Sequence, residues 1–123
     1  MNEITTTWET LSKLLELRNR KEITEFIELL SPSETARTIS RLSGEEQSLL
    51  LSLLTPEDAA DMLEDIPDAQ AADLVEEISS AQAAAIMEEL ESDHLVDVLG
   101  EMDEEISSAI LAEMHTEEAE EAR

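Results

Sequence analysis

Residues Leu54–Ile66 read LTPEDAADMLEDI, and this stretch contains one complete unit of the pattern that organises the chain. Thr55 stands where a helix N-cap is expected, and Pro56 suits the first helical position. Asp58 lies three residues after Thr55, where its carboxylate can reach back to the cap amide. The unit therefore predicts a short helix that begins after Thr55 and ends before the apolar residue Ile66.

The same unit recurs every 12 residues, and in a longer form every 24 residues. In one continuous helix, 12 residues advance a position by about 120° beyond full turns, so a recurring apolar residue would leave the apolar face. The chain is therefore expected to break and turn once per unit. The first apolar ladder is Leu30, Leu42, Leu54, Ile66, Ile78, Leu90, Met102 and Met114, and the second is Ile39, Leu51, Leu63, Val75, Met87, Leu99 and Leu111.

Residues that interrupt or start helices stand at these steps. Pro32, Gly44 and Pro56 are 12 residues apart, and Pro67 lies one residue before the next step. A hydroxyl residue followed three positions later by an acid or amide is typical of an N-cap. The caps predicted on this pattern are Ser31, Ser43, Thr55 and Ser79, and the weaker ones are Ser92–Asp93, Asp103 and Thr116.

Helices of about nine or ten residues are marginal alone, because nucleation is costly, so they must pack side by side. Small residues at mid-unit would let neighbouring helices approach closely: Ala36, Ala60, Ala72, Ala84 and Ser108. The sequence therefore predicts an all-α fold, a right-handed superhelix (α-solenoid) of about ten short antiparallel helices. Residues 1–19 are predicted to form an N-terminal cap helix with Ile4, Trp8, Leu11, Leu15 and Arg18 at helical spacing, and residues 20–123 the helical repeat domain.

The charge of the chain is large and unevenly distributed. Its 123 residues include 32 Asp plus Glu against 7 Lys plus Arg, for a net charge of −25. Residues 42–122 contain 25 acids and no Lys or Arg. This balance excludes a basic surface for nucleic acid or an anionic membrane. The acids repel one another over about 8 to 10 Å at ordinary salt, so an external cation is expected to neutralise part of the field.

Catalytic and soft-metal chemistry find little support. The chain has no Cys and only two separated glycines, so it offers no thiolate site and no glycine-rich phosphate loop. His94 and His115 have no second His or Cys at ligand spacing and are interpreted as solvated or capping residues. The prediction is that the chain is not an enzyme. The internal methionines lie on or next to the ladders and are predicted to fill the core: Met62, Met87, Met102 and Met114.

Targeting signals are also missing from the sequence given. The N-terminus carries an acid at Glu3 and no apolar run behind a basic start, so no secretory signal is predicted. The longest uncharged stretch, 47–56, is about half of the roughly 20 residues that a spanning helix needs. A soluble chain in the cytoplasm is expected.

Clustered carboxylates are hard oxygen ligands that suit Mg²⁺ or Ca²⁺. No EF-hand loop is present, so a site would be assembled across helices or shared between two surfaces. The alternative stays open that these acids are only a solvated surface, or that they reflect a salt-loving source.

The succession of units resembles a known family, the N-terminal cytosolic domain of MgtE magnesium transporters. The resemblance spans about residues 20–123. It rests on residues 54–66 together with the segments 73–78 and 86–90, which follow in the same 12-residue register. It implies an acidic superhelix joined to a pair of CBS domains and a membrane pore, acting as a homodimer on the cytoplasmic side of the cell membrane. Contact with the membrane would come only through a transmembrane domain that this chain does not contain.

The resemblance also implies a regulatory role for Mg²⁺. In the family, intracellular Mg²⁺ binds between the acidic domain and the CBS pair, screens their repulsion and closes the pore. Residues in register with the family's metal-binding acids are Asp61, in an Ala-Ala-acid-x-Leu segment, and Asp93 and Asp97, in an acid-x-Leu-x-Asp segment read two units later. His94 departs from the family, where an acid is common beside the first of these.

A second interpretation remains open from the sequence. Helical solenoids of the flagellar motor switch are similar in build, and such a scaffold would bind a protein on its concave face without an ion. Continuation of the gene into CBS-like and apolar segments of about 20 residues would favour the transporter.

Overall fold

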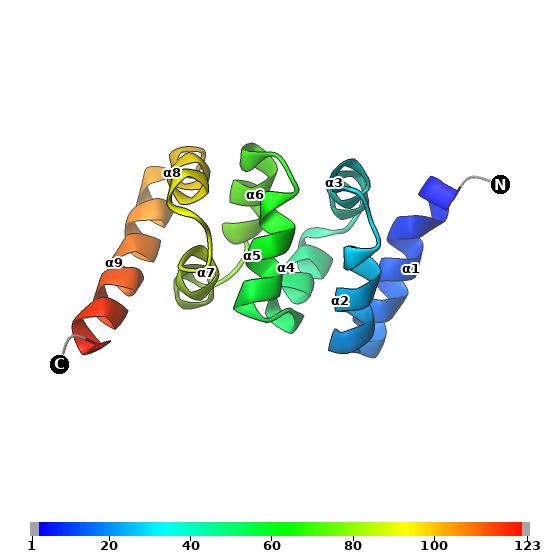
Figure 1. Cartoon of the computed structure of the whole chain (residues 1–123), viewed down its shortest axis with the longest axis horizontal. Coiled ribbons are helices and arrows are strands. Elements are labelled where there is room, and N and C mark those ends of the chain that lie inside the picture. The colour runs from blue at the N-terminus through cyan, green and yellow to red at the C-terminus, as the bar shows by residue number, and fades with distance from the viewer. Residues whose placement is uncertain (1–2, 122–123) are drawn as a thin grey trace.

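The computed structural model describes the backbone of residues 3–121 and the side chains of residues 7–114. The described part consists of nine helices without a strand, arranged in an elongated array from α1 at one end to α9 at the other (Figure 1). The connections between helices are two to four residues long. The helices are α1 (Glu3–Leu17), α2 (Arg20–Glu28), α3 (Pro32–Ser40), α4 (Gly44–Leu53), α5 (Pro56–Glu64), α6 (Asp68–Val75), α7 (Ser80–Met87), α8 (Ser92–Gly100) and α9 (Glu104–Glu121).

The helix starts follow the 12-residue period of the sequence. Ser31 and Ser43 each form a complete capping box with the glutamate three residues later. Thr55 and Ser79 accept hydrogen bonds from the backbone amides of Asp58 and Gln82. These four predicted N-caps are confirmed. The full series of N-caps before α2 to α8 is Asn19, Ser31, Ser43, Thr55, Pro67, Ser79 and Glu91.

The weaker caps have mixed outcomes. Asp103 accepts a hydrogen bond from the Glu105 amide at 3.0 Å, so it caps α9. Ser92 was expected to be a cap, but the N-cap is Glu91 without a side-chain bond, and Ser92 begins α8 itself. The break expected at Thr116 is also wrong, because α9 continues through it to Glu121. No Pro or Gly stands there to stop the helix, so the described part has nine helices where about ten were expected.

We predict that the two serines differ sharply in their effect on stability. Ser43→Ala removes the hydroxyl whose oxygen accepts a hydrogen bond from the Glu46 backbone amide, with 3.1 Å between Oγ and N. The change should lower the free energy of unfolding by about 1 kcal/mol. Ser92→Ala should change it by less than about 0.5 kcal/mol, because Ser92 makes no cap bond. Urea denaturation of both variants measures the difference. Equal losses would show that α8 begins one residue later than described.

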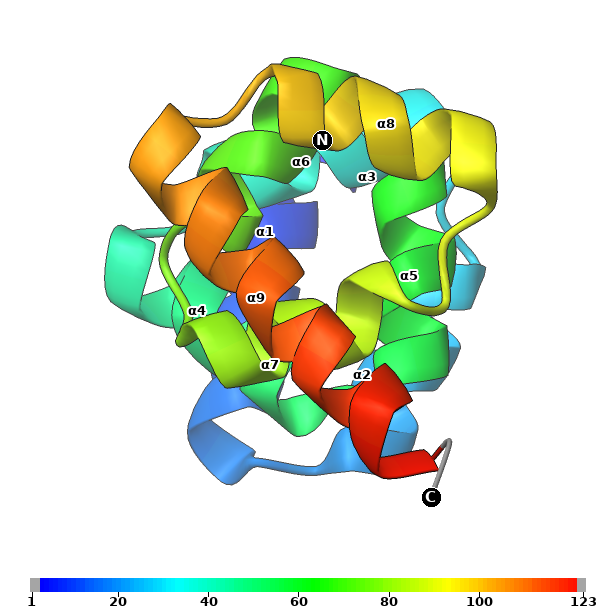
Figure 2. The ribbon, with the colours of Figure 1, turned by 90° about the vertical axis from the view of Figure 1, so that its left-hand side faces the viewer.

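The helices stack mainly on second neighbours along the chain. Among the described helices, α5 packs on α7 and α7 on α9, while α4 packs on α6 and α6 on α8. Figure 2, viewed along the long axis, shows α6 and α8 on the same side of the array. From α4 to α9 the odd and even helices thus form two rows, so two successive 12-residue units make one 24-residue structural repeat. The handedness of the superhelix and the antiparallel order of the helices remain predictions.

The N-terminal helix caps one end of this stack. Helix α1 packs against α2, α3 and α4, and it buries Leu11 and Leu15 completely or nearly so. Trp8 is half-buried, whereas the side chain of Ile4 lies outside the described residues. Arg18 was expected on the same apolar face but is exposed, and its φ of 54° places it in the turn after the helix. An αL residue ends the helical path, so Arg18 leaves the face that it would share with Leu11.

Both ladders line the core that runs between the rows. On the first ladder Leu42, Leu54, Ile66, Leu90 and Met102 are buried, and the other members are half-buried. On the second, Ile39, Leu51, Leu63, Val75 and Met87 are buried, Leu99 is half-buried, and Leu111 on the last helix is 38% exposed. Among the methionines, Met62, Met87 and Met102 are buried and Met114 packs against the core, so their predicted role is confirmed.

The expectation for small residues holds in the middle of the chain. Ala60, Ala72 and Ala84 are at most 2% exposed, and Ala36 is half-buried. Ser108 was expected to play the same role but is exposed. It lies on α9, the last helix of the described stack, where that face meets solvent. Among the described helices, none is both long and apolar enough to cross a membrane.

Candidate functional site on the acidic helices

The acidic side chains of α4 to α9 lie on the outside of the array. Between Glu45 and Glu113 none is buried, and all but four are exposed. The half-buried ones are Glu46, Asp58, Asp68 and Glu76. This distribution follows from the ladders, which give the interior to apolar residues and leave the acids to water.

Two of the half-buried acids hold helices together. Ser12 on α1 donates a hydrogen bond to the carboxylate of Glu46 on α4. This bond, with a second one from the Ser43 backbone amide, lowers the pKa of Glu46, so the group is ionised at neutral pH. Glu76 Oε2 accepts a hydrogen bond from the Asp103 amide at 2.9 Å, at the N-terminal end of α9. These acids serve the fold, and their charges are already engaged.

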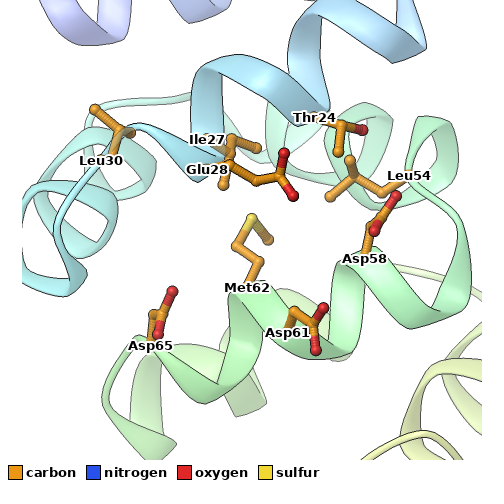
Figure 3. Close-up of a pocket in the computed structure, with 9 residues that line it drawn as sticks. All are labelled: Thr24, Ile27, Glu28, Leu30, Leu54, Asp58, Asp61, Met62 and Asp65. Carbon is orange, nitrogen blue, oxygen red and sulfur yellow. The ribbon is translucent and has the colours of Figure 1, made fainter.

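Asp61 lies on α5 at the rim of a pocket. The two preceding residues, Ala59 and Ala60, are buried, and Asp61 is exposed on the side that faces α2 across the opening. The pocket has a volume of about 90 Å³ and lies between α2 and α5 (Figure 3). Its wall consists of Thr24, Ile27, Glu28, Leu30, Leu54, Asp58, Asp61, Met62 and Asp65.

Asp93 and Asp97 lie four residues apart on α8, so they share one face of the helix. Both are exposed, and Val96 beside them is 66% exposed. The opposite face of α8 is anchored by Val98, which is fully buried, and the helix packs on α6. The two carboxylates are therefore held on an ordered helix and directed to solvent.

The three predicted metal ligands are not brought together. Within the described residues no group of three or more His, Cys, Asp or Glu side chains could hold a metal ion. Asp61 belongs to the row of α5 and α7, whereas Asp93 and Asp97 belong to the row of α6 and α8. Within the described residues, at most two carboxylates are therefore close enough together to bind the same metal ion. Two carboxylates make a partial coordination shell for a hard divalent ion.

His94 lies differently from expectation. It was interpreted as solvated or capping, but its side chain is 23% exposed and its Nε2 atom is 3.7 Å from Asp68 Oδ1 on α6. The Nε2 atom is buried and has no hydrogen-bond partner. His94 thus faces Asp68 at the α6–α8 contact. The side chain of His115 lies outside the described residues.

Several polar contacts between helices are not predicted by the sequence pattern. Gln70 Nε2 donates to the Ala36 carbonyl at 2.8 Å and ties α6 to α3. Gln47 Nε2 donates to the carbonyls of Ile39 and Leu42 at the end of α3. The pocket rim adds Glu28, Asp58 and Asp65 to Asp61. A 12-residue pattern carries no signal for such contacts, because they join residues whose separation depends on how the rows stack.

The comparisons with known proteins identify the family. The family described as the MgtE intracellular N domain matches residues 30–123. The chain belongs to this family. Among solved structures, the crystal structure of the soluble part of a magnesium transporter is similar at 20% sequence identity and a TM-score of 0.44, over 92% of this chain. The chain spans 50% of the length of that structure. A comparison with curated proteins finds no match.

Proposed function

We propose that the chain is the cytosolic regulatory domain of a magnesium transporter, which senses intracellular Mg²⁺ through acidic residues facing a pair of CBS domains. Membership of the MgtE intracellular N domain family carries this proposal. The exposed carboxylates of Asp93 and Asp97, on a face of α8 without a basic neighbour in residues 42–122, support it. The domain itself catalyses no reaction and acts by binding.

The incomplete clustering of acids suits a site that is shared between two domains. Mg²⁺ keeps several of its waters and takes one or two carboxylates from a protein surface. Asp93 and Asp97 supply such a pair from this chain, and the remaining ligands come from the CBS domains. Asp61 on α5 makes a separate contact, because it belongs to the other row of helices.

Charge repulsion turns ion binding into a conformational signal. A net charge of −25 opposes contact with a second acidic surface. Mg²⁺ bound between the surfaces neutralises part of this field and binds only the closed arrangement well, so its concentration sets the population of that arrangement. Closure of the cytosolic part then closes the pore. The complete protein acts as a homodimer on the cytoplasmic side of the cell membrane, which it meets through its transmembrane domain.

The test follows compaction of the full-length transporter, or of this chain joined to its downstream soluble region. Protease sensitivity and scattering radius are measured against Mg²⁺ concentration. Asp93→Ala combined with Asp97→Ala should raise the midpoint at least about tenfold, because about 1.4 kcal/mol of ion binding is lost. Asp61→Ala alone should raise it less.

A matched control separates these ligands from general screening. Glu57→Ala combined with Glu64→Ala removes two other exposed acids, both from α5, and should leave the midpoint within about twofold. Equal shifts in both double variants would mean that only net charge matters. Compaction that does not change with Mg²⁺ concentration would overturn the proposal. It would favour the alternative, a helical scaffold that binds a protein partner without an ion.

A further inference from the structure

The pocket between α2 and α5 is lined by both apolar side chains and carboxylates. A metal ion would need only the carboxylates. Its walls carry four apolar side chains, and Figure 3 shows Met62 projecting from α5 toward α2 at its centre. Carboxylates surround this apolar part from both helices. The apolar members are Ile27, Leu30, Leu54 and Met62, and the acidic members are Glu28, Asp58, Asp61 and Asp65.

The acidic rim has no internal counterion. Among residues 7–114 the structure gives these four carboxylates no ion pair, although six basic residues lie between Lys13 and Arg41. The fold therefore leaves a partly apolar pocket ringed by carboxylates that form no ion pair. Such a lining favours a ligand that carries both an apolar part and a positive charge.

The geometry also says which cation fits. Within the described residues no three acids could hold a metal ion, so this pocket offers a metal ion no complete coordination shell. Mg²⁺ gives up water reluctantly and gains nothing from methylene and thioether walls. The volume of about 90 Å³ is far below the roughly 300 to 1,000 Å³ of pockets for drug-sized ligands. Only a slender ligand, or the end of one side chain, can enter.

We propose that this pocket binds an aliphatic ammonium group, whose methylene chain lies on the half-buried Ile27, above the buried Met62, while its charge meets Glu28 and Asp58. The chemistry is that of a free aliphatic amine or of a lysine side chain from a partner protein. This inference goes beyond the proposed magnesium sensing and does not rest on it. It gives the acidic domain a second, organic cation to recognise.

The test is isothermal titration of the chain at constant ionic strength with ammonium, ethylammonium, butylammonium and 1,4-diaminobutane. One saturable site is expected, and affinity should rise by up to about fourfold for each methylene that becomes buried. A short peptide with one central lysine forms a second arm. Tighter binding of the peptide than of butylammonium assigns the site to a partner's lysine, and the reverse assigns it to a free amine.

Two double variants decide whether the pocket is responsible. Glu28→Gln with Asp58→Asn should weaken butylammonium binding at least about tenfold. Glu25→Gln with Glu57→Gln removes one exposed acid from each of the same helices outside the pocket and should leave affinity within about twofold. Equal weakening in both variants, affinity independent of chain length, or no binding to either arm would overturn the proposal. Asp61, Asp93 and Asp97 stay intact, so these outcomes are independent of the magnesium test.

Discussion

Leu63→Ala should lower the free energy of unfolding by about 2 to 5 kcal/mol, the range for a leucine truncated in a packed interior. Leu63 is fully buried in α5 and belongs to the core between the two rows. The loss combines the transfer energy of the deleted methyl and methylene groups with the cavity that they leave. Because domains are stable by only about 5 to 15 kcal/mol, one such change removes a large share of the total.

Urea denaturation measures this loss through the midpoint, with an unchanged slope showing that the unfolding unit is the same. The matched control is Leu111→Ala, because Leu111 holds the same ladder position on α9 but is 38% exposed. It should cost less than about 1 kcal/mol. Equal costs would contradict the burial described for α5.

Ala84→Leu tests the close approach of helices from the opposite direction. Ala84 is fully buried in α7, and α7 packs on α5 on one side and α9 on the other. Three added carbons have no space, so neighbouring helices must move apart at a cost of about 1 to 3 kcal/mol or more. Because the stack transmits contacts only between neighbours, the displacement should loosen α9 before it affects α1.

Ala81→Leu is the control for this substitution, since Ala81 lies one turn earlier on the same helix and is exposed. Its effect should stay within about 0.5 kcal/mol. Hydrogen exchange on both variants shows where protection falls. A similar loss in the two variants, or loss confined to α1, would contradict the stacking of α7 between α5 and α9.

Helix starts and core positions were predictable because both depend on local chemistry. Ser31, Ser43 and Thr55 cap helices with groups three residues away, so the sequence contains the whole interaction. The apolar ladders fail only where the stack ends, as at Leu111. Arg18 and Ser92 were predicted wrongly because no distinctive residue marks the turns beside them, and Thr116 was predicted wrongly because α9 continues through it without a turn.

The candidate site was predictable only in part. The exposed acidic surface follows from composition, and Asp93 and Asp97 share a face because they lie four residues apart. The role of any acid as a metal ligand remains a prediction. The pairing of His94 with Asp68 and the pocket beside Asp61 were not foreseen, because each joins two helices that are not consecutive.

The sequence alone determined the all-helical class, the length of the repeat, the N-caps at Ser31, Ser43, Thr55 and Ser79, and the division between an apolar interior and an acidic exterior. These features arise from interactions within one unit, and a 12-residue period displays them directly. The tertiary structure alone decided which helices stack and which acids are engaged. Ser12 and Glu46 are 34 residues apart and Glu76 and Asp103 are 27 apart. Such contacts depend on the rotation between successive units, which accumulates along the stack and which no local pattern encodes.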